Sequence, residues 1–231
     1  MRKVGLLGGM SWESTAEYYR LLNEGVRAAL GGLHSARLVL ASVDFAEVER
    51  MQAEERWDEA GELLAAEARG LEAAGAELVL LCTNTMHKVA DTVAAAIGVP
   101  LLHLADATAD AVAAAGLTTV GLLGTAFTME QDFYRGRLAS HGLTVLVPDA
   151  GDRSLVHGVI YDELCVGVVR EASRDAVHQV VERLVERGAE GVVLGCTELE
   201  LLLPPDQLGA VRLFPTTRLH VAAALDVMLG P

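Results

Sequence analysis

Residues 74–85 read AGAELVLLCTNT, and residues 187–198 read RGAEGVVLGCTE. In each stretch a glycine precedes a run of leucine and valine, which is typical of a strand buried on both faces of a parallel sheet. Each run ends at a cysteine that a small polar residue follows. The pattern therefore predicts, twice in one chain, a buried strand with a thiol at its carboxyl end.

A second pair of similar segments accompanies the first pair. KVGLLGGM at 3–10 recurs as TVGLLGTA at 119–126, in the same order and at nearly the same offset along the chain. Two matches at one offset indicate two homologous halves. We place the first half at residues 1–104, completed by 212–231, and the second at 105–211, with a cleft between them.

Short apolar runs alternate with helical patterns through both halves, which is the signature of βαβ units around a parallel sheet. The periodicity predicts helices at 58–74 and 173–187, and a short strand and a helix within 211–230. The fold class that we expect is α/β, built as two pseudo-symmetric three-layer halves with parallel sheets. The predicted strands are 4–7, 38–43, 78–81, 120–123, 143–147 and 192–194.

Composition argues against several kinds of partner. The 231 residues are 52% apolar, but no stretch approaches the roughly 18 uncharged residues of a membrane span. A formal net charge of −14, with 18 basic residues that form no run, is unsuited to a phosphate backbone. Three cysteines without an export signal favour a reducing compartment. We expect a globular cytoplasmic protein that binds neither nucleic acid nor membrane.

The sequence gives no sign of a cofactor or a metal. Lys3 and Lys88 are the only lysines, and neither lies where a pyridoxal phosphate Schiff base would form. The histidines and cysteines lack metal-ligand spacing. The glycines of LLGGMS and LLGTA fit neither GxGxxG nor GxxxxGK[ST], and tight turns between strand and helix explain them. We therefore expect no cofactor and no metal.

Cys82 and Cys196 are the strongest candidates for chemistry. The carboxyl ends of parallel strands are where open α/β sheets bind ligands, and a helix beginning there stabilises a thiolate. A single cysteine of this kind is as well explained by packing. Two equivalent ones, facing each other across the cleft, suit the removal of a proton from one face of a carbon and its return to the other. We interpret Cys165 as a buried structural thiol in a helix, and His87 as solvated or supporting.

The chain also resembles the aspartate/glutamate racemase family, over essentially its whole length. The resemblance implies a two-domain α/β enzyme, commonly a homodimer, that racemises aspartate or glutamate with two thiols and no cofactor. The matching motifs are GLLGGMSWEST near the start, VDFAEVERMQ at 43–52, CTNTMHK at 82–88, GLLGTAFTME at 121–130, YDELC at 161–165 and LGCTELELL at 194–202.

Carried over by motif, the resemblance implies that Cys82 and Cys196 are the two acid/base residues. Glu198 would pair with the substrate ammonium. The residues that would hold a substrate carboxylate are Thr83, Asn84 and Thr85. The other implied pocket residues are Met10, Gln52, Thr125 and Thr197, with Thr128 as a weaker candidate.

One position departs from the family pattern. Some relatives carry a basic residue after YDELC that receives the distal carboxylate, whereas Val166 follows Cys165 here and the next basic residue is Arg170. Arg50 is another candidate source of positive charge. The sequence does not rank aspartate against glutamate.

Other interpretations stay open beside this one. A glutamate or hydantoin racemase would share the scaffold, and so would a one-cysteine decarboxylase or isomerase, which the presence of both thiols disfavours. A non-catalytic amino-acid-binding protein is the alternative from another functional class.

Overall fold

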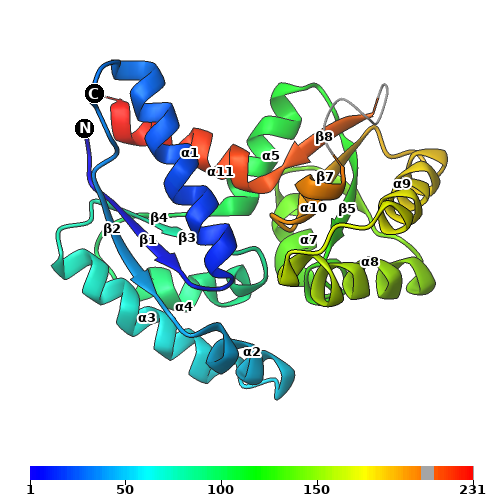
Figure 1. Cartoon of the computed structure of the whole chain (residues 1–231), viewed down its shortest axis with the longest axis horizontal. Helices are drawn as coiled ribbons and strands as arrows, with labels where there is room; N and C mark the ends of the chain where they lie inside the picture. Colours follow the sequence, from blue (N-terminus) through cyan, green and yellow to red (C-terminus); the bar gives the residue numbers. More distant parts are fainter. Residues whose placement is uncertain (204–210, 231) are drawn as a thin grey trace. The chain divides into compact units, whose positions relative to one another are not determined.

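The computed structural model describes residues 1–203 and 211–230 of the chain. Two compact units are present, one formed by Met1–Leu104 with His220–Pro231 and the other by Ala105–Leu219. Each unit holds one four-stranded parallel sheet flanked by helices (Figure 1). The predicted α/β fold with two parallel sheets is confirmed.

The first sheet has the strand order β2-β1-β3-β4. Side chains alternate across it, so that Leu6 and Leu80 point to one face while Leu7 and Leu81 point to the other. All four are buried, because helices cover both faces. The strands are β1 (Val4–Gly8), β2 (Leu38–Ser42), β3 (Leu78–Leu81) and β4 (Leu101–Leu102).

Helices α1 (Trp12–Leu30) and α11 (Thr216–Leu229) cover one face of this sheet, and α2 (Phe45–Ala53), α3 (Trp57–Ala73) and α4 (Ala90–Ala95) cover the other. On the first of these faces, apolar residues at helical spacing on α1 pack against the sheet. These residues are Tyr18, Leu22 and Val26. Burial of each such side chain contributes about 1.5–3 kcal/mol, which fixes the helix against the sheet.

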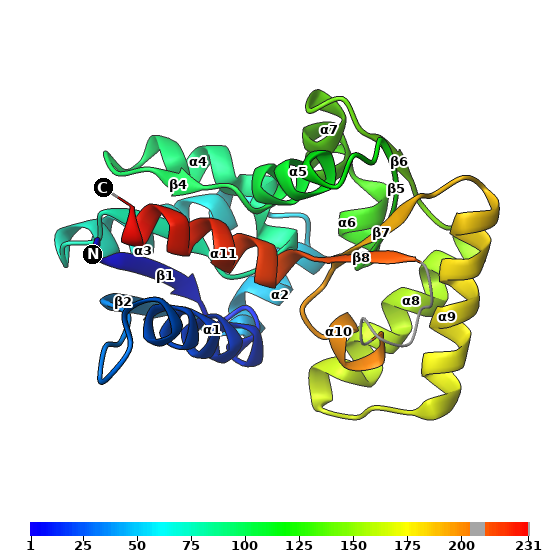
Figure 2. The ribbon, with the colours of Figure 1, turned by 90° about the horizontal axis from the view of Figure 1, so that it is seen from above.

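The second sheet repeats the first in its topology, with the order β6-β5-β7-β8. Helices α8 and α9 pack on the face that carries Val192 and Leu194, and Figure 2 shows α5 and α7 on the opposite side of these strands. The strands are β5 (Thr119–Gly124), β6 (Thr144–Leu146), β7 (Gly191–Gly195) and β8 (Arg212–Pro215). The helices are α5 (Leu104–Ala114), α6 (Ala126–Glu130), α7 (Asp132–Ser140), α8 (Ala150–Asp162), α9 (Glu171–Glu186) and α10 (Leu199–Leu202).

The predicted strands and the three predicted helices are all present, to within one or two residues at most ends, and β8 and α11 are the strand and helix expected within 211–230. Strand β4 was not predicted, because two residues between Pro100 and His103 show no periodicity. The expectation that all of 212–231 completes the first half is wrong for β8, which pairs with β7 and so belongs to the second sheet. The predicted second half, 105–211, includes residues 204–210, which lie outside the described residues.

The segments after Cys82 and Cys196, and the segment around Cys165, differ from the helices that we expected there. After Cys82 the chain forms a 3-10 helix, η1 (Thr85–Val89), before α4, and α10 after Cys196 has only four residues. Cys165 lies in a short 3-10 helix, η2 (Leu164–Val166), and is only partly buried.

Within residues 1–203 and 211–230, no helix is both long and apolar enough to cross a membrane.

Candidate functional site

Each thiol lies at the topological switch point of its sheet, where the strands that follow are added on the other side of the first strand. Because the order is β2-β1-β3-β4 in one sheet and β6-β5-β7-β8 in the other, the switch points lie at the carboxyl ends of β1 and β3, and of β5 and β7, where open α/β sheets bind ligands. Cys82 follows β3, and its backbone N–H donates to the carbonyl of Leu7 in β1 at 2.9 Å. Cys196 follows β7 in the same way. We call residues 82–85 the first thiol loop and residues 196–198 the second thiol loop.

The first thiol is fully buried on the sheet face that α1 and α11 cover. Its Sγ lies 3.8 Å from the carbonyl oxygen of Leu80, which is the hydrogen-bond acceptor of this thiol. Burial raises the pKa of Cys82, because the loss of water around the sulfur disfavours the charged thiolate. The Ser14 hydroxyl donates to the Cys82 carbonyl at 3.3 Å and so ties the loop to α1.

The polar residues of the first thiol loop are also buried, and each is less than a tenth exposed. The Thr83 N–H donates to the Leu81 carbonyl at 2.9 Å, which turns the chain tightly after the strand. Asn84 precedes η1, and its Oδ1 is buried without a hydrogen-bond partner among the described residues. Thr85 begins η1. The predicted CTNT residues therefore form one compact turn with an unused acceptor.

Gln52 joins this turn from α2. Its side chain is 3% exposed, and its Nε2 donates to Met86 Sδ at 2.9 Å, directly after the first thiol loop. The Gln52 Oε1, like Asn84 Oδ1, is buried and has no partner in the described part of the chain. Met10 belongs to the same apolar cluster as Met86. A buried acceptor left without a donor costs about 1–3 kcal/mol, so these two oxygens are suited to a ligand that brings N–H groups.

The second thiol has a charged neighbour. Cys196 is 9% exposed, and its Sγ donates to Glu198 Oε2 at 3.0 Å. Burial raises the pKa of Cys196 well above its usual range, and the carboxylate of Glu198 and the nearby Cys165 raise it further. The Glu198 N–H lowers the pKa of Cys196, as expected of a helix start, but burial outweighs this effect. Burial dominates at both thiols, and the helices that follow begin as a 3-10 turn and as a four-residue segment.

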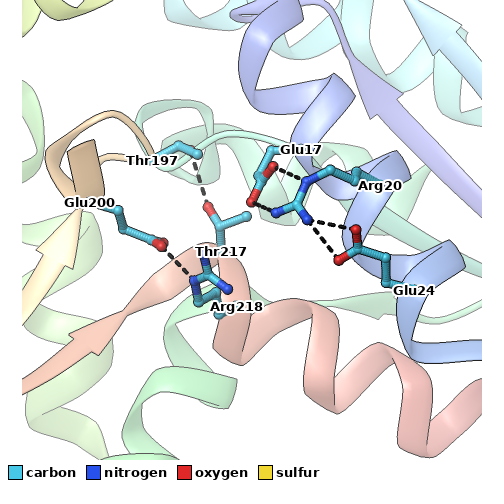
Figure 3. Close-up of polar contacts among 7 residues, drawn as sticks. All are labelled: Glu17, Arg20, Glu24, Thr197, Glu200, Thr217 and Arg218. Atoms are coloured by element: carbon cyan, nitrogen blue, oxygen red, sulfur yellow. Dashed lines mark hydrogen bonds and ion pairs between the residues drawn. The ribbon is translucent and has the colours of Figure 1, made fainter. Parts of the chain in front are cut away.

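The start of α11 holds the second thiol loop in place. Thr217 Oγ1 lies 3.1 Å from Thr197 Oγ1, and the Arg218 guanidinium lies 2.6 Å from the Glu200 carboxylate; both contacts are drawn in Figure 3. The buried Thr216 hydroxyl also donates to the carbonyl of Leu194 at 2.8 Å. Three successive residues of α11 thus contact β7 and the residues that follow it.

Thr125 lies beside Cys196, because Gly124 and Gly195 pair at the ends of β5 and β7. The Thr125 hydroxyl accepts from the Thr128 N–H at 3.4 Å and so caps α6. Thr128 is fully buried and contacts Thr125 through its own hydroxyl at 3.3 Å. The structure therefore gives both hydroxyls a part in forming the strand-to-helix turn.

The residues predicted for the site fall into two sets, one in each unit. The first set contains Met10, Gln52, Cys82, Thr83, Asn84 and Thr85, and the second contains Thr125, Cys196, Thr197 and Glu198. Arg50 is exposed on α2. Arg170 forms an ion pair with Glu163 at 2.9 Å.

Several residues that build these turns were not predicted. Besides Ser14, they include Thr15, which accepts from the Gly9 N–H at 2.8 Å, and Thr216 and Thr217. The segments SWEST and PTTR could have indicated them. Both place hydroxyl side chains at the first turn of a helix that directly follows a strand or its turn, where such groups bond to neighbouring backbone.

Comparison with known proteins agrees with this architecture. A protein from Yersinia pestis described as a candidate Asp/Glu racemase is 52% identical, with a TM-score of 0.94 over 99% of this chain and 100% of its own. An aspartate racemase homologue, PH1733 from Pyrococcus horikoshii OT3, is 33% identical, with a TM-score of 0.88 over 99% and 100%. The aspartate racemase of Picrophilus torridus, 22% identical with a TM-score of 0.80 over 100% and 95%, shares the fold.

The sequence model of the Asp/Glu/hydantoin racemase family matches residues 7–224, a range that includes both thiol loops. With this match and the relatives above, the chain belongs to the Asp/Glu/hydantoin racemase family.

Proposed function

We propose that this protein racemises aspartate or glutamate without a cofactor, with Cys82 and Cys196 as its two acid/base groups. The observation that carries the proposal is the equivalent position of the two thiols. Each follows the strand at the switch point of a sheet, and the two sheets have the same strand order. Equivalent strand ends in two homologous units supply the two proton-transfer groups that inversion at one carbon needs.

In the proposed reaction, one thiol enters as the thiolate and takes the α-proton of the substrate. The electron pair of the broken C–H bond is delocalised into the α-carboxylate, and the other thiol donates its proton to the opposite face of the carbon. At the end of the turnover the first group is a thiol and the second a thiolate. The opposite enantiomer reacts by the same steps in reverse.

The raised pKa of both thiols suits this chemistry. A Cα–H bond is a very weak acid, so a base with a high pKa reduces the pKa difference between proton donor and acceptor. Burial raises the pKa of each thiol and so makes the thiolate, once formed, a stronger base. At the second thiol, Sγ donates to the Glu198 carboxylate, which raises the pKa of the thiol further.

The unused acceptors of the first unit support an amino-acid substrate. Gln52 Oε1 and Asn84 Oδ1 are both buried and lack donors among the described residues, and a substrate ammonium carries three N–H groups. Thr83 and Thr85 add hydroxyl groups, which can donate to a carboxylate. We therefore assign the ammonium group to the two amide oxygens, instead of to Glu198 as the resemblance implied, and the α-carboxylate to Thr83 and Thr85.

Racemisation in heavy water tests the proposal. With one enantiomer of aspartate or glutamate as the starting material, we expect the product enantiomer to carry deuterium at Cα from its first appearance. The remaining starting enantiomer should stay largely unlabelled early in the reaction, because its own thiol would have to exchange before returning a proton. Chiral chromatography coupled to mass spectrometry separates and measures both pools.

Early transfer of the substrate's own α-hydrogen to the product would indicate a single base and would contradict the two-thiol mechanism. Binding of aspartate or glutamate without turnover would favour the non-catalytic alternative.

A further inference from the structure

A buried histidine lies directly behind the first thiol loop. His87 is 3% exposed in η1, and the structure gives both of its ring nitrogens a backbone partner. Nδ1 lies 2.7 Å from the carbonyl oxygen of Thr83, and the backbone N–H of Leu104 points at Nε2 at 3.2 Å. The ring therefore connects the first thiol loop to the residue at which α5 begins.

These two partners fix the protonation and the tautomer of the ring. A carbonyl oxygen only accepts, so Nδ1 must carry a hydrogen, and a backbone N–H only donates, so Nε2 must not carry one. His87 is therefore neutral with its proton on Nδ1. Neither nitrogen is available to a metal ion or to a substrate in this arrangement. Among the described residues, no three His, Cys, Asp or Glu side chains are grouped to hold a metal.

The planarity of the peptide carries the effect of this contact into the loop. In a trans peptide the carbonyl and the following N–H point in opposite directions. A Thr83 carbonyl held toward His87 therefore points the Asn84 N–H away from the ring. His87 thus orients the peptide between Thr83 and Asn84 and does not itself reach the reacting atoms.

We propose that His87 is a positioning residue for the first thiol loop, acting through its Nδ1–H on the Thr83 carbonyl. This inference rests on the proposed function of that loop. Two neighbouring histidine rings confine the imidazole, since the His103 and His220 centroids lie 4.6 Å and 5.9 Å from that of His87. His220 is itself held by Tyr18 at 2.8 Å and by the Leu102 carbonyl at 2.9 Å.

Two substitutions separate the two hydrogen bonds of His87. In His87→Asn the amide Nδ2 occupies the place of Nδ1 and can donate to Thr83, but Leu104 loses its acceptor. In His87→Gln the side-chain oxygen can accept from Leu104, but nothing at the δ position donates to Thr83. His87→Ala removes both bonds. His34→Asn changes an exposed histidine of the first unit and serves as the control.

In kinetics and thermal denaturation of the full chain, we expect His87→Asn and His87→Gln to rank in opposite orders for activity and for melting temperature. His87→Ala and His87→Gln should lower kcat/KM by about tenfold or more, since misplacing a reacting group has effects of this size. His87→Asn should recover most of the kcat/KM that His87→Ala loses and yet melt at a lower temperature than His87→Gln. Loss of activity that simply follows the melting temperature in all variants, or full activity of His87→Gln, would overturn the proposal.

The tautomer gives a readout that does not depend on turnover. In ¹⁵N-labelled protein, the ring nitrogens of His87 should show a protonated Nδ1 and an unprotonated Nε2, identified by the loss of these signals in His87→Asn. The opposite tautomer would overturn the positioning role. Absence of racemase activity in the unmodified protein, with the expected tautomer present, would instead contradict the proposed function.

Discussion

The two thiol loops occupy the same position in sheets of the same topology, yet their surroundings differ. Cys82 is sealed from solvent and its thiol donates to the Leu80 carbonyl, whereas Cys196 lies against the carboxylate of Glu198 at 3.0 Å. Among the described residues, the Cys82 thiol donates to a backbone carbonyl, whereas the Cys196 thiol donates to a carboxylate two residues away. The two strand ends thus place the thiol alike but give it different neighbours.

The turns beside the two thiols differ in the same way. In the first unit Gly9 has a φ of +91°, and a Cβ there would collide with the backbone of Val43, so only glycine fits. In the second unit Thr125 takes the matching place in the repeated segment with a φ of −65° and caps α6 itself. The first turn therefore leaves space for the backbone of Val43, whereas the second has a hydroxyl group at the matching position.

The largest effect that we predict concerns the thiols themselves. Cys82→Ala and Cys196→Ala should each lower racemisation by about 10³-fold or more, since each removes one of two required proton-transfer groups. Turnover of both enantiomers of aspartate and glutamate, followed by chiral chromatography, measures the loss. Cys165→Ala is the matched control, because Cys165 is a partly buried thiol in η2, and should have a mild effect. Full activity of Cys82→Ala would rule out equivalent roles for the two strand ends.

The next prediction concerns the unused acceptor in the first unit. Gln52→Met keeps the length of the side chain and removes a buried oxygen that lacks a donor among the described residues. We expect KM to rise by about tenfold, because a hydrogen bond to a charged group is worth about 1.5–3 kcal/mol, while the free energy of unfolding stays equal or rises. Steady-state kinetics and denaturant titration measure the two quantities. A fall in stability with unchanged KM would show that Gln52 serves the fold and not the ligand.

A third prediction addresses the contrast between the two thiols through pH. The Glu198 carboxylate raises the pKa of Cys196, so Glu198→Gln should lower that pKa, and the thiolate should form at lower pH. Titration of thiolate absorbance in a Cys82→Ala, Cys165→Ala background isolates the Cys196 thiol. Glu200→Gln in the same background removes a carboxylate that contacts Arg218 instead, and should leave the midpoint in place. A midpoint that moves upward in Glu198→Gln would refute the assigned cause.

The parts of this fold that could be predicted are those that depend on local sequence. Strands buried on both faces consist of leucine and valine runs, so 78–81 and 192–194 were recognisable, and each cysteine was placed by the run before it. The repeat then indicated two similar sheets. The two residues of β4 and the four of α10 are too short to show a period, and so they could not be recognised.

The contacts that distinguish the two loops could not be predicted. Ser14 reaches Cys82 across 68 residues of sequence, and Gln52 reaches Met86 across 34. Such contacts depend on which helix ends at which strand, which no local pattern encodes. The Cys196–Glu198 bond is local, but it depends on the backbone conformation of the loop, because residues two apart meet only in a turn.

The smallest effect that we predict tests whether α11 supports the second thiol loop as His87 is proposed to support the first. Thr217→Val keeps the shape of the side chain and removes the 3.1 Å contact with Thr197. We expect kcat/KM to fall by about twofold to fivefold, because a neutral hydrogen bond contributes about 0.5–1.5 kcal/mol and Thr197 keeps its place in the chain. Glu17→Gln, which weakens an exposed ion pair on α1 drawn in the same close-up (Figure 3), is the control and should leave kcat/KM unchanged. A loss of 10²-fold or more in Thr217→Val would mean that Thr217 contacts the substrate directly, and no loss would mean that the Thr217–Thr197 contact does not support the second thiol loop.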